Sequence, residues 1–342
     1  MALGLAIGLA TYRPHLLQGS SDPQASVPAP SSQTTPLSPP SDEVRYPITN
    51  PPLVDADSLF GHITALASER YTQAEREQAR AYLVRTLQQL GWSPLSLPFE
   101  TGVNLLAQRV GTDPTAGAIL VAAHYDTVPG SPGADDNASG LAVVLEVARL
   151  LRSRPTARSL QVAFFDREEA GLLGSRAFVG NRSLLEDLRG VIVLDMIGFA
   201  CRSPGCQRYP DGLPPLPLRD QGDFLAVLGD LEHSPLLKPF QAASMPPDLP
   251  PVLTLPVPLR GALLPDTLRS DHAPFWLKGI GALLVSDTAN LRSPHYHQPS
   301  DTIGTLDSKF LAGAAQLVIN ATTALLESTA PTEATPVNIP TP

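Results

Sequence analysis

The residues most able to do chemistry lie in five short segments rich in histidine and acids. These segments are His124-Tyr-Asp126, Asp135-Asp136-Asn137, Glu168-Glu169, Asp195 and His295-Tyr-His297. Each is ordinary by itself, because acid pairs often begin helices and Asp-Asn runs often form turns. Together, their imidazole nitrogens and carboxylate oxygens form a ligand set that suits zinc, manganese or cobalt. The sequence therefore predicts a metal centre, if the fold brings the segments together.

Strands are expected immediately before three of these segments. Apolar runs over 118–123, 160–165 and 191–194, interrupted only by Gln161, have strand length and end at His124, Asp166 and Asp195. Such runs fit strands that are buried on both faces. Ligand sites in α/β sheets form at the carboxyl ends of the strands, so we expect the three segments to meet at one edge.

Helices alternate with these strands along the chain. Thr72 and Glu75 form a capping box that predicts a helix ending at Gly91, and helical spacing recurs over 140–151, 169–179 and 308–326. Further strands are expected over 104–110, 224–228 and 282–285, whereas the proline-rich stretch 208–265 predicts long loops around one strand. We therefore expect an α/β fold with a central sheet flanked by helices on both faces.

Composition divides the chain into four parts. Residues 1–19 begin with an apolar segment, residues 20–53 are rich in proline and serine and predict a flexible linker, residues 54–327 form the folded domain, and residues 328–342 form a disordered tail. The net charge is −9 and no basic stripe occurs, so nucleic acid is not an expected partner.

Two features bear on the cellular compartment. The apolar run at residues 1–10 is too short to span a membrane; it is either the remnant of a signal peptide or anchor, or a frayed terminus. Cys201 and Cys206 flank a Pro-Gly turn, so they form a disulfide, two free thiols or two metal ligands. We favour the disulfide, which places the protein outside the cytoplasm, periplasmic, secreted or membrane-anchored.

As an ordered set, the motifs resemble those of the co-catalytic zinc exopeptidases. The matching segments are His124-x-Asp126, Asp136-Asn-Ala-Ser-Gly140, Glu168-Glu169, Asp195-Met and Tyr296-His297-x-x-x-Asp301. That family includes bacterial leucine aminopeptidases, aminopeptidase Y and the glutamate carboxypeptidase group, and the resemblance covers about 103–326. It implies a three-layer, phosphorylase/hydrolase-like fold with a mixed, mostly parallel sheet, and hydrolysis of peptides at a chain end by a metallopeptidase, with aminopeptidase activity as the expectation.

The resemblance also implies residue roles. His124 and Asp195 would bind one zinc ion, Glu169 and His297 the second, and Asp136 would bridge them, with Asp135 as the competing bridge. Glu168 would be the general base, and Asp126 would hydrogen-bond the far nitrogen of His124. Similar Ser-Asp-His segments line the substrate side in this family. We therefore expect Asp271, His272 and Tyr296 to contact substrate or support the ligands, unless Asp271 caps the next helix and His272 simply packs.

Three other functions fit parts of the pattern. Glutaminyl cyclases resemble this family but typically have Trp before the last histidine ligand, where this chain has Tyr296. A carboxypeptidase should present an arginine to the substrate carboxylate, and five loop arginines are candidates: Arg202, Arg208, Arg260, Arg269 and Arg292. A binding ectodomain without activity should have lost ligands or the base, and all are present here.

Overall fold

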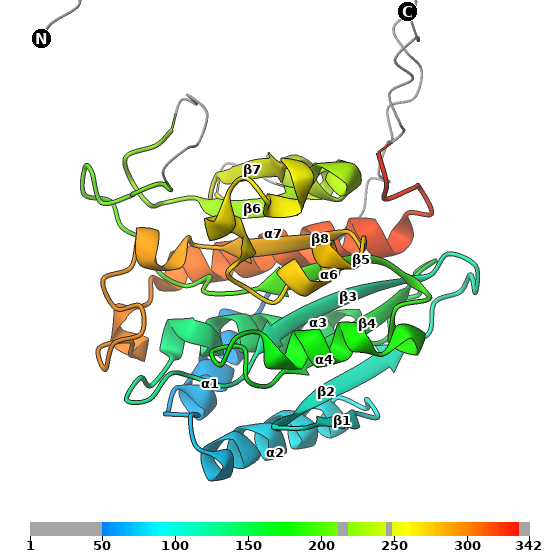
Figure 1. Cartoon of the computed structure of the whole chain (residues 1–342), viewed down its shortest axis with the longest axis horizontal. Helices are drawn as coiled ribbons and strands as arrows, with labels where there is room; N and C mark the ends of the chain where they lie inside the picture. Colours follow the sequence, from blue (N-terminus) through cyan, green and yellow to red (C-terminus); the bar gives the residue numbers. More distant parts are fainter. Residues whose placement is uncertain (1–49, 211–217, 244–247, 335–342) are drawn as a thin grey trace, which may run out of the picture. The chain divides into compact units, whose positions relative to one another are not determined.

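An eight-stranded mixed sheet is the centre of the part of the chain that the computed structural model describes, which comprises residues 50–210, 218–243 and 248–334 (Figure 1). The strand order is β1-β2-β4-β3-β5-β8-β6-β7. Strands β4, β3, β5 and β8 run parallel, as do β6 and β7, whereas β1 with β2, β2 with β4, and β6 with β8 are antiparallel. The strands are β1 (Leu95–Phe99), β2 (Gly102–Arg109), β3 (Ala118–His124), β4 (Ser159–Phe165), β5 (Leu188–Leu194), β6 (Leu225–Asp230), β7 (Val252–Val257) and β8 (Ala282–Ser286).

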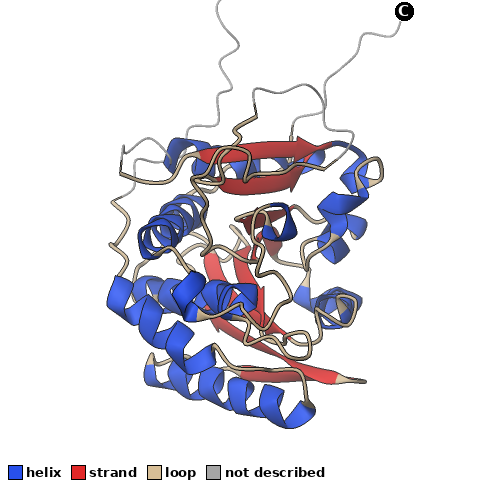
Figure 2. Cartoon of the chain, turned by 90° about the vertical axis from the view of Figure 1, so that its left-hand side faces the viewer, coloured by secondary structure: helices blue, strands red, loops and turns tan. Residues whose placement is uncertain are grey.

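Helices cover both faces of this sheet (Figure 2). One apolar cluster joins one sheet face to α1, α2, α3, α5 and α7, and a second joins the other face to α4 and α6. The predicted α/β class, with a mostly parallel sheet between helical layers, is therefore confirmed. The helices are α1 (Ala56–Leu66), α2 (Gln73–Gln89), α3 (Gly140–Leu151), α4 (Leu173–Gly180), α5 (Lys238–Ala243), α6 (Ala273–Leu277) and α7 (Ser308–Glu327).

Local signals in the sequence agree with several elements. The Thr72 side chain accepts a hydrogen bond from the Glu75 N–H, and the Glu75 carboxylate accepts one from the Thr72 N–H, so the capping box begins α2 as predicted. Every residue of β3 is buried, which explains its unbroken apolar run.

Other elements differ from the expectation. The predicted helix over 169–179 begins only at Leu173, because Gly171 and Leu172 have positive φ values of 103° and 61° and end the preceding turn. The predicted loops of 208–265 contain α5 and the strand β7 as well as β6, and β1 was also missed. Pro98 and Pro256 interrupt the apolar patterns of β1 and β7, the two outermost strands of the sheet, where proline is tolerated.

The domain limits also differ from the expected 54–327. Residues 50–54 contact the fold, since the Gln316 side chain bonds both Val54 N–H and Pro52 carbonyl. Residues 328–334 do not behave as a disordered tail: Thr332 is buried and the Ala334 N–H donates to the Glu232 carbonyl. The apolar segment 1–19, linker residues 20–49 and residues 335–342 lie outside the described residues.

Helix α7 is the one described helix that is long and apolar enough to cross a membrane. However, 78% of that stretch is buried inside the fold, against α3 and α5. Its hydrophobicity is therefore that of a core helix.

Candidate metal centre

The predicted ligands converge at the carboxyl ends of the parallel strands. His124 ends β3, Asp195 follows β5, Glu169 follows β4, and His297 lies in the loop after β8. Asp136 comes from the turn between β3 and α3. Their ligand atoms form two groups, His124–Asp136–Asp195 and Asp136–Glu169–His297, and the atoms of each group lie within 4.8 Å of one another.

Asp136 belongs to both groups because its two oxygens face opposite ways. Its Oδ1 lies 3.3 Å from His124 Nε2, and its Oδ2 lies 3.3 Å from His297 Nε2. His124 Nε2 is also 3.7 Å from Asp195 Oδ1, and His297 Nε2 is 3.0 Å from Glu169 Oε2. A carboxylate between two histidines has the geometry of a bridging ligand.

The neighbouring Asp135 points elsewhere. Its Oδ1 accepts a hydrogen bond from the Gly198 N–H at 2.8 Å, and its carboxyl lies against that of Asp287. Burial and the Asp287 charge raise the pKa of Asp135 well above its usual range. Asp135 is therefore in neither group of ligand atoms.

Long-range hydrogen bonds fix the turn that carries Asp136. The Asp301 carboxylate accepts from the Asp135 and Asp136 N–H groups at 2.9 and 3.0 Å. The Asn137 amide donates to the Leu194 carbonyl and accepts from the Gly140 N–H, which ties the turn to the end of β5. A Cβ on Gly140 would lie 2.3 Å from Asn137 Oδ1, so glycine is required there. The sequence motif contained Asp301 but did not indicate this role.

Asp126 supports the site in a way that the sequence did not predict. Its carboxylate Oδ1 is 3.6 Å from His124 Nδ1, whereas its main-chain oxygen is nearer, at 3.2 Å. The two carboxylate oxygens instead accept hydrogen bonds from the Glu168 and Glu169 N–H groups, at 3.0 and 3.2 Å. The side chain of Asp126 thus holds the acid pair in position, and its main chain meets the histidine.

Glu168 lies in the wall of the same cavity but outside both ligand groups. It is 8% exposed, and burial is the largest influence that raises the pKa of its carboxyl well above the usual range. His124 opposes this shift, whereas Asp195 and Asp271 add to it. A buried carboxyl near the ligands that belongs to neither ligand group has the position expected of a proton acceptor.

The pKa shifts of the crowded acids and histidines indicate whether divalent cations would fit this site. Burial, together with the Asp136 charge, raises the pKa of Glu169 to about 7. The pKa of His297 rises to about 9, since contacts with Asp136 and Glu169 outweigh the effect of burial. Glu169 Oε1 is buried without a hydrogen-bond partner among the described residues. Divalent cations would satisfy these carboxylates and this oxygen, so the residues fit metal ions.

The Ser270-Asp271-His272 segment lies behind the cavity. Asp271 does not cap α6; its carboxylate accepts a hydrogen bond from the Ser175 hydroxyl. His272 is fully buried, with Nε2 2.7 Å from the Thr267 carbonyl and its ring edge-on to Trp276. Of the three, only Ser270 contributes to the cavity wall. Asp271 thus contacts Ser175 and His272 packs against Trp276, and neither lines the cavity.

The cavity itself has a volume of about 410 Å³. The ligands form one side, and apolar side chains from β6, β7 and β8, including Leu228, Leu255 and Leu284, form another. The Tyr296 ring stacks on the His297 ring with centroids 3.6 Å apart, so it also borders the ligands.

Cys201 and Cys206 are joined by a disulfide in the loop after β5. Gln207, which directly follows this bridge, lines the cavity. Two cysteines bonded to each other do not act as metal ligands.

Comparison with known proteins shows what this region is similar to. Residues 104–217 match the pattern of Peptidase family M28. The chain is 33% identical over 212 residues to "Uncharacterized protein YfbL" of Escherichia coli, and this alignment covers 59% of this chain and 65% of that protein. It is 48% identical over 82 residues to "Aminopeptidase YwaD" of Bacillus subtilis, covering 23% and 18%, and 30% identical over 241 residues to "Probable lipoprotein aminopeptidase LpqL" of Mycobacterium tuberculosis, covering 63% and 44%. The chain thus spans less than two thirds of the length of these relatives.

Solved structures share the fold. The LapA aminopeptidase of Legionella pneumophila has a TM-score of 0.65 at 21% identity, over 80% of this chain and 73% of that one. The zinc aminopeptidase BSAP of Bacillus subtilis has a TM-score of 0.50 at 27% identity, over 64% and 49%. The glutaminyl cyclase of Porphyromonas gingivalis has a TM-score of 0.58 at 20% identity, over 79% and 98%.

Proposed function

Because residues 104–217 match Peptidase family M28, we propose that the chain is a zinc-dependent exopeptidase that removes residues from the amino end of peptides. The observation that carries the proposal is the position of Asp136, with one oxygen toward His124 and the other toward His297. Two ions that share a carboxylate are the arrangement of co-catalytic peptidases. The names of YwaD and of BSAP support the aminopeptidase activity and the zinc.

Two ions would divide the ligands between them. His124 and Asp195 would hold one, Glu169 and His297 would hold the other, and Asp136 would bridge the pair. Manganese or cobalt would suit the same nitrogen and oxygen ligands. When bound, such ions polarise a peptide carbonyl and lower the pKa of water from about 15.7 towards 7.

The residues around the ions would then transfer the proton and hold the acid pair in position. Glu168, which is not needed as a ligand, accepts the proton of the attacking water and passes it to the leaving amine. Asp126 fixes the direction of Glu168 and Glu169 through their N–H groups. Asp271, held by Ser175, is one of the acids that raise the pKa of Glu168, which favours uptake of the proton by Glu168.

The number of ions can be tested by removing one ligand at a time. We expect the purified protein to contain two zinc ions per molecule, as measured by elemental mass spectrometry. Because the His124 group remains intact, His297→Ala should retain one ion, whereas Asp136→Ala should weaken both sites. Equal loss in the two variants would contradict a bridging Asp136.

The reaction is tested with matched substrates. Leucyl p-nitroanilide and Leu-Gly-amide should be hydrolysed, and their N-acetyl forms should not, because an aminopeptidase needs a free amine. Hydrolysis of N-acetyl-Leu-Gly, which has a free C-terminal carboxylate, but not of its C-terminal amide would identify a carboxypeptidase instead. Cyclisation of a peptide with N-terminal Gln, without hydrolysis, would identify a glutaminyl cyclase, whose fold is shared but whose usual Trp is here Tyr296.

We also place the protein outside the cytoplasm, either secreted or anchored at a membrane. The disulfide between Cys201 and Cys206 supports an oxidising compartment. The names of LpqL, a lipoprotein, and of the vacuolar membrane protease of Candida albicans, 33% identical over 120 residues, point in the same direction. Fractionation of native cells checks this: recovery in the cytosol with two free thiols would contradict it.

A further inference from the structure

Of the lysine and arginine residues that the structure describes, Arg269 alone lines the cavity. Three of the other loop arginines are engaged elsewhere. Arg202 pairs with Asp307 and Arg260 pairs with Glu232, whereas Arg292 is buried and donates to Gln207 and to main-chain oxygens. Arg208 and Arg269 remain, and both contact Asn290.

Arg269 is exposed yet held in one place. Its Nη1 donates to Asn290 Oδ1 at 2.8 Å, and its Nη2 donates to the Tyr296 hydroxyl at 3.1 Å. The guanidinium carbon lies 5.8 Å from the centre of the Tyr296 ring, which itself stacks on His297. A single aromatic side chain therefore separates the guanidinium from a proposed metal ligand. A guanidinium has five N–H groups, so others stay free to donate.

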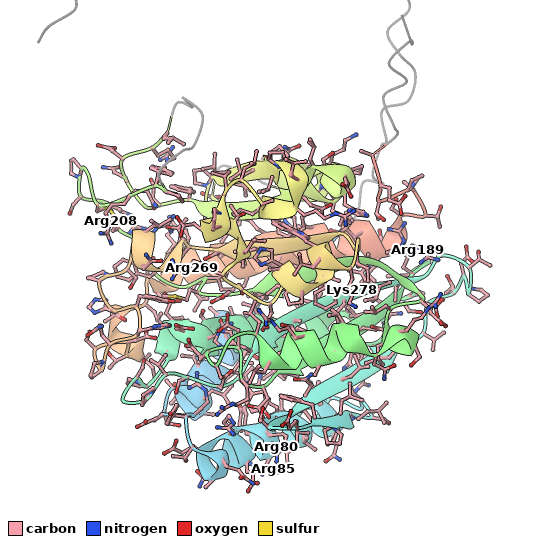
Figure 3. The ribbon with its side chains drawn as sticks, in the orientation of Figure 1. Arg80, Arg85, Arg189, Arg208, Arg269 and Lys278 are labelled. Carbon is pink, nitrogen blue, oxygen red and sulfur yellow. A yellow bond between two sulfur atoms is a disulfide. The ribbon has the colours of Figure 1, made fainter. Side chains whose placement is uncertain are left out.

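Arg208 approaches the same loop from the segment that follows the disulfide. It donates to the main-chain oxygen of Asn290, whereas Arg269 donates to the side chain of that residue. The two arginines lie near each other on one side of the molecule, and Arg189 lies on the opposite side (Figure 3). Neither arginine forms an ion pair with any acid among the described residues.

Arg269 differs in charge from the acidic and apolar side chains that form most of the cavity wall. Acids contribute to the lining at Asp136, Glu168, Glu169, Asp195 and Asp266, and most of the remaining wall is apolar. With ions bound to the acids, a substrate carboxylate in the cavity would still be poorly solvated by the apolar part of the wall. Beside Arg269, it would instead meet free N–H donors with the planar geometry that pairs with a carboxylate.

We propose that Arg269, with Arg208 behind it, forms a carboxylate-binding subsite at the mouth of the cavity, so that the preferred substrates are short peptides that carry a carboxylate near the scissile bond. The proposal rests on the function proposed above. One residue spans about 3.5 Å, so the C-terminal carboxylate of a dipeptide or tripeptide can reach across one aromatic ring from the ions. An acidic side chain supplies the same chemistry, and the test separates these sources.

Matched pairs of substrates that differ only in this charge test the proposal. Leu-Gly and Leu-Gly-Gly are compared with their C-terminal amides, Leu-Asp-amide with Leu-Asn-amide, and glutamyl with glutaminyl p-nitroanilide. In the unmodified protein, kcat/KM should favour the charged member of at least one pair by about tenfold, the usual strength of a charge-assisted hydrogen bond at a partly exposed site. The favoured pair identifies the source of the carboxylate.

Variants connect the preference to the residue. Arg269→Gln should reduce the ratio of charged to uncharged substrate to about one, and Arg269→Lys should retain part of it. The control is Arg189→Gln, because among the described residues that side chain donates to the nearby carbonyls of Glu186 and Leu188, and its loss should leave the ratio unchanged. Equal kcat/KM within every pair, or a preference that survives Arg269→Gln, would overturn the proposal.

Binding provides a readout that does not depend on turnover. The reduced-bond analogue of Leu-Gly and its C-terminal amide are titrated calorimetrically into the zinc-loaded protein and into Arg269→Gln. A C-terminal subsite predicts tighter binding of the acid, lost in the variant; if the favoured substrate pair carries its charge on a side chain, the corresponding reduced-bond pair is used. Failure to hydrolyse any substrate, neutral ones included, would refute the aminopeptidase activity, whereas equal binding of acid and amide would refute the subsite alone.

Discussion

Neighbouring residues of like type have different surroundings at this site. Asp136 faces two histidines while Asp135 faces the Gly198 N–H, and Glu169 joins a ligand group while Glu168 does not. The left-handed backbone at Arg167, with φ of 64°, helps to turn the acid pair away from the course of β4. The direction of the main chain thus gives adjacent residues of the same type different partners.

Removal of the proposed proton acceptor should separate metal binding from turnover. Glu168→Gln keeps the size of the side chain but not its basicity, and Glu168 is not in either ligand group. We expect kcat to fall by roughly 10²- to 10⁴-fold, with the zinc content unchanged. Hydrolysis of leucyl p-nitroanilide and metal analysis are the measurements. A variant with near-normal kcat would exclude Glu168 as the base.

At the scale of elements, one buried arginine holds together the segments that lead into the site. The Arg70 guanidinium donates to five main-chain oxygens, at the end of α1, after β3 and in the turn before Asp136, namely those of Leu66, Ser68, Tyr125, Pro132 and Gly133. Burial lowers its pKa to about 10, and the charges of Asp136, Asp126, Asp301 and Glu169 limit that decrease. Arg70 therefore remains charged at neutral pH. Sequence reasoning missed it because its guanidinium donates to main-chain oxygens, which leave no pattern of residue types in the sequence.

Arg70→Lys should lower both stability and metal affinity. A lysine has three N–H donors on a single nitrogen and cannot reach oxygens on several sides, so buried carbonyls would lose their partners. We expect the free energy of unfolding to fall by about 2–4 kcal/mol, measured in urea. Arg85→Lys, on the exposed face of α2, is the matched control and should change little. Equal stability of the two variants would contradict the role of Arg70.

A second element-scale contact lies at the end of β6, remote from the ligands. His233 Nδ1 and Asp230 Oδ2 are 2.5 Å apart, and His233 is buried beside Gly281. Burial lowers the pKa of His233, but the hydrogen bond and charge of Asp230, with the charges of Glu333 and Glu232, raise it by more. The net result is a raised pKa in the folded state.

This shift gives the contact a defined pH dependence. Because the folded-state pKa is raised, its stabilisation is complete below the unfolded value of about 6.5 and is lost as the pH rises through the folded value. The difference in unfolding free energy between the unmodified protein and His233→Gln should therefore shrink from pH 6 upwards. Each unit of pKa shift corresponds to about 1.4 kcal/mol. If the difference in unfolding free energy grew with pH, the pKa of His233 would be lowered in the folded state and the prediction would be wrong.

At the scale of the whole molecule, a protein of net charge −9 gathers buried and half-buried acids in one place. Asp136, Glu169 and Asp195 lie close together, and the nearby cation Arg70 is used for the main chain. Such an arrangement is unfavourable unless bound cations offset it. Metal binding and stability should consequently be linked across the fold.

Chelation is expected to reveal this linkage. With free zinc at 1,000 times its Kd, binding stabilises the folded state by about 4 kcal/mol. Treatment with EDTA should therefore lower the thermal midpoint by several degrees as well as abolish hydrolysis, and zinc should restore both. Scanning calorimetry before and after dialysis measures the effect. If the thermal midpoint is unchanged after the metal has been shown to be removed, metal binding and stability are not linked.

Local patterns of residues were sufficient to predict the class of chemistry and the elements that carry it. Buried parallel strands leave a strong record in apolar runs, and ligands at their ends follow directly, as with His124 after 118–123. The capping box of α2 is likewise local. Two outcomes came from the folded chain instead: Arg269 among five loop arginines lines the cavity, and residues 328–334 pack on the fold. These outcomes depend on side-chain direction and on contacts between segments far apart in the chain, which no local pattern of residues encodes.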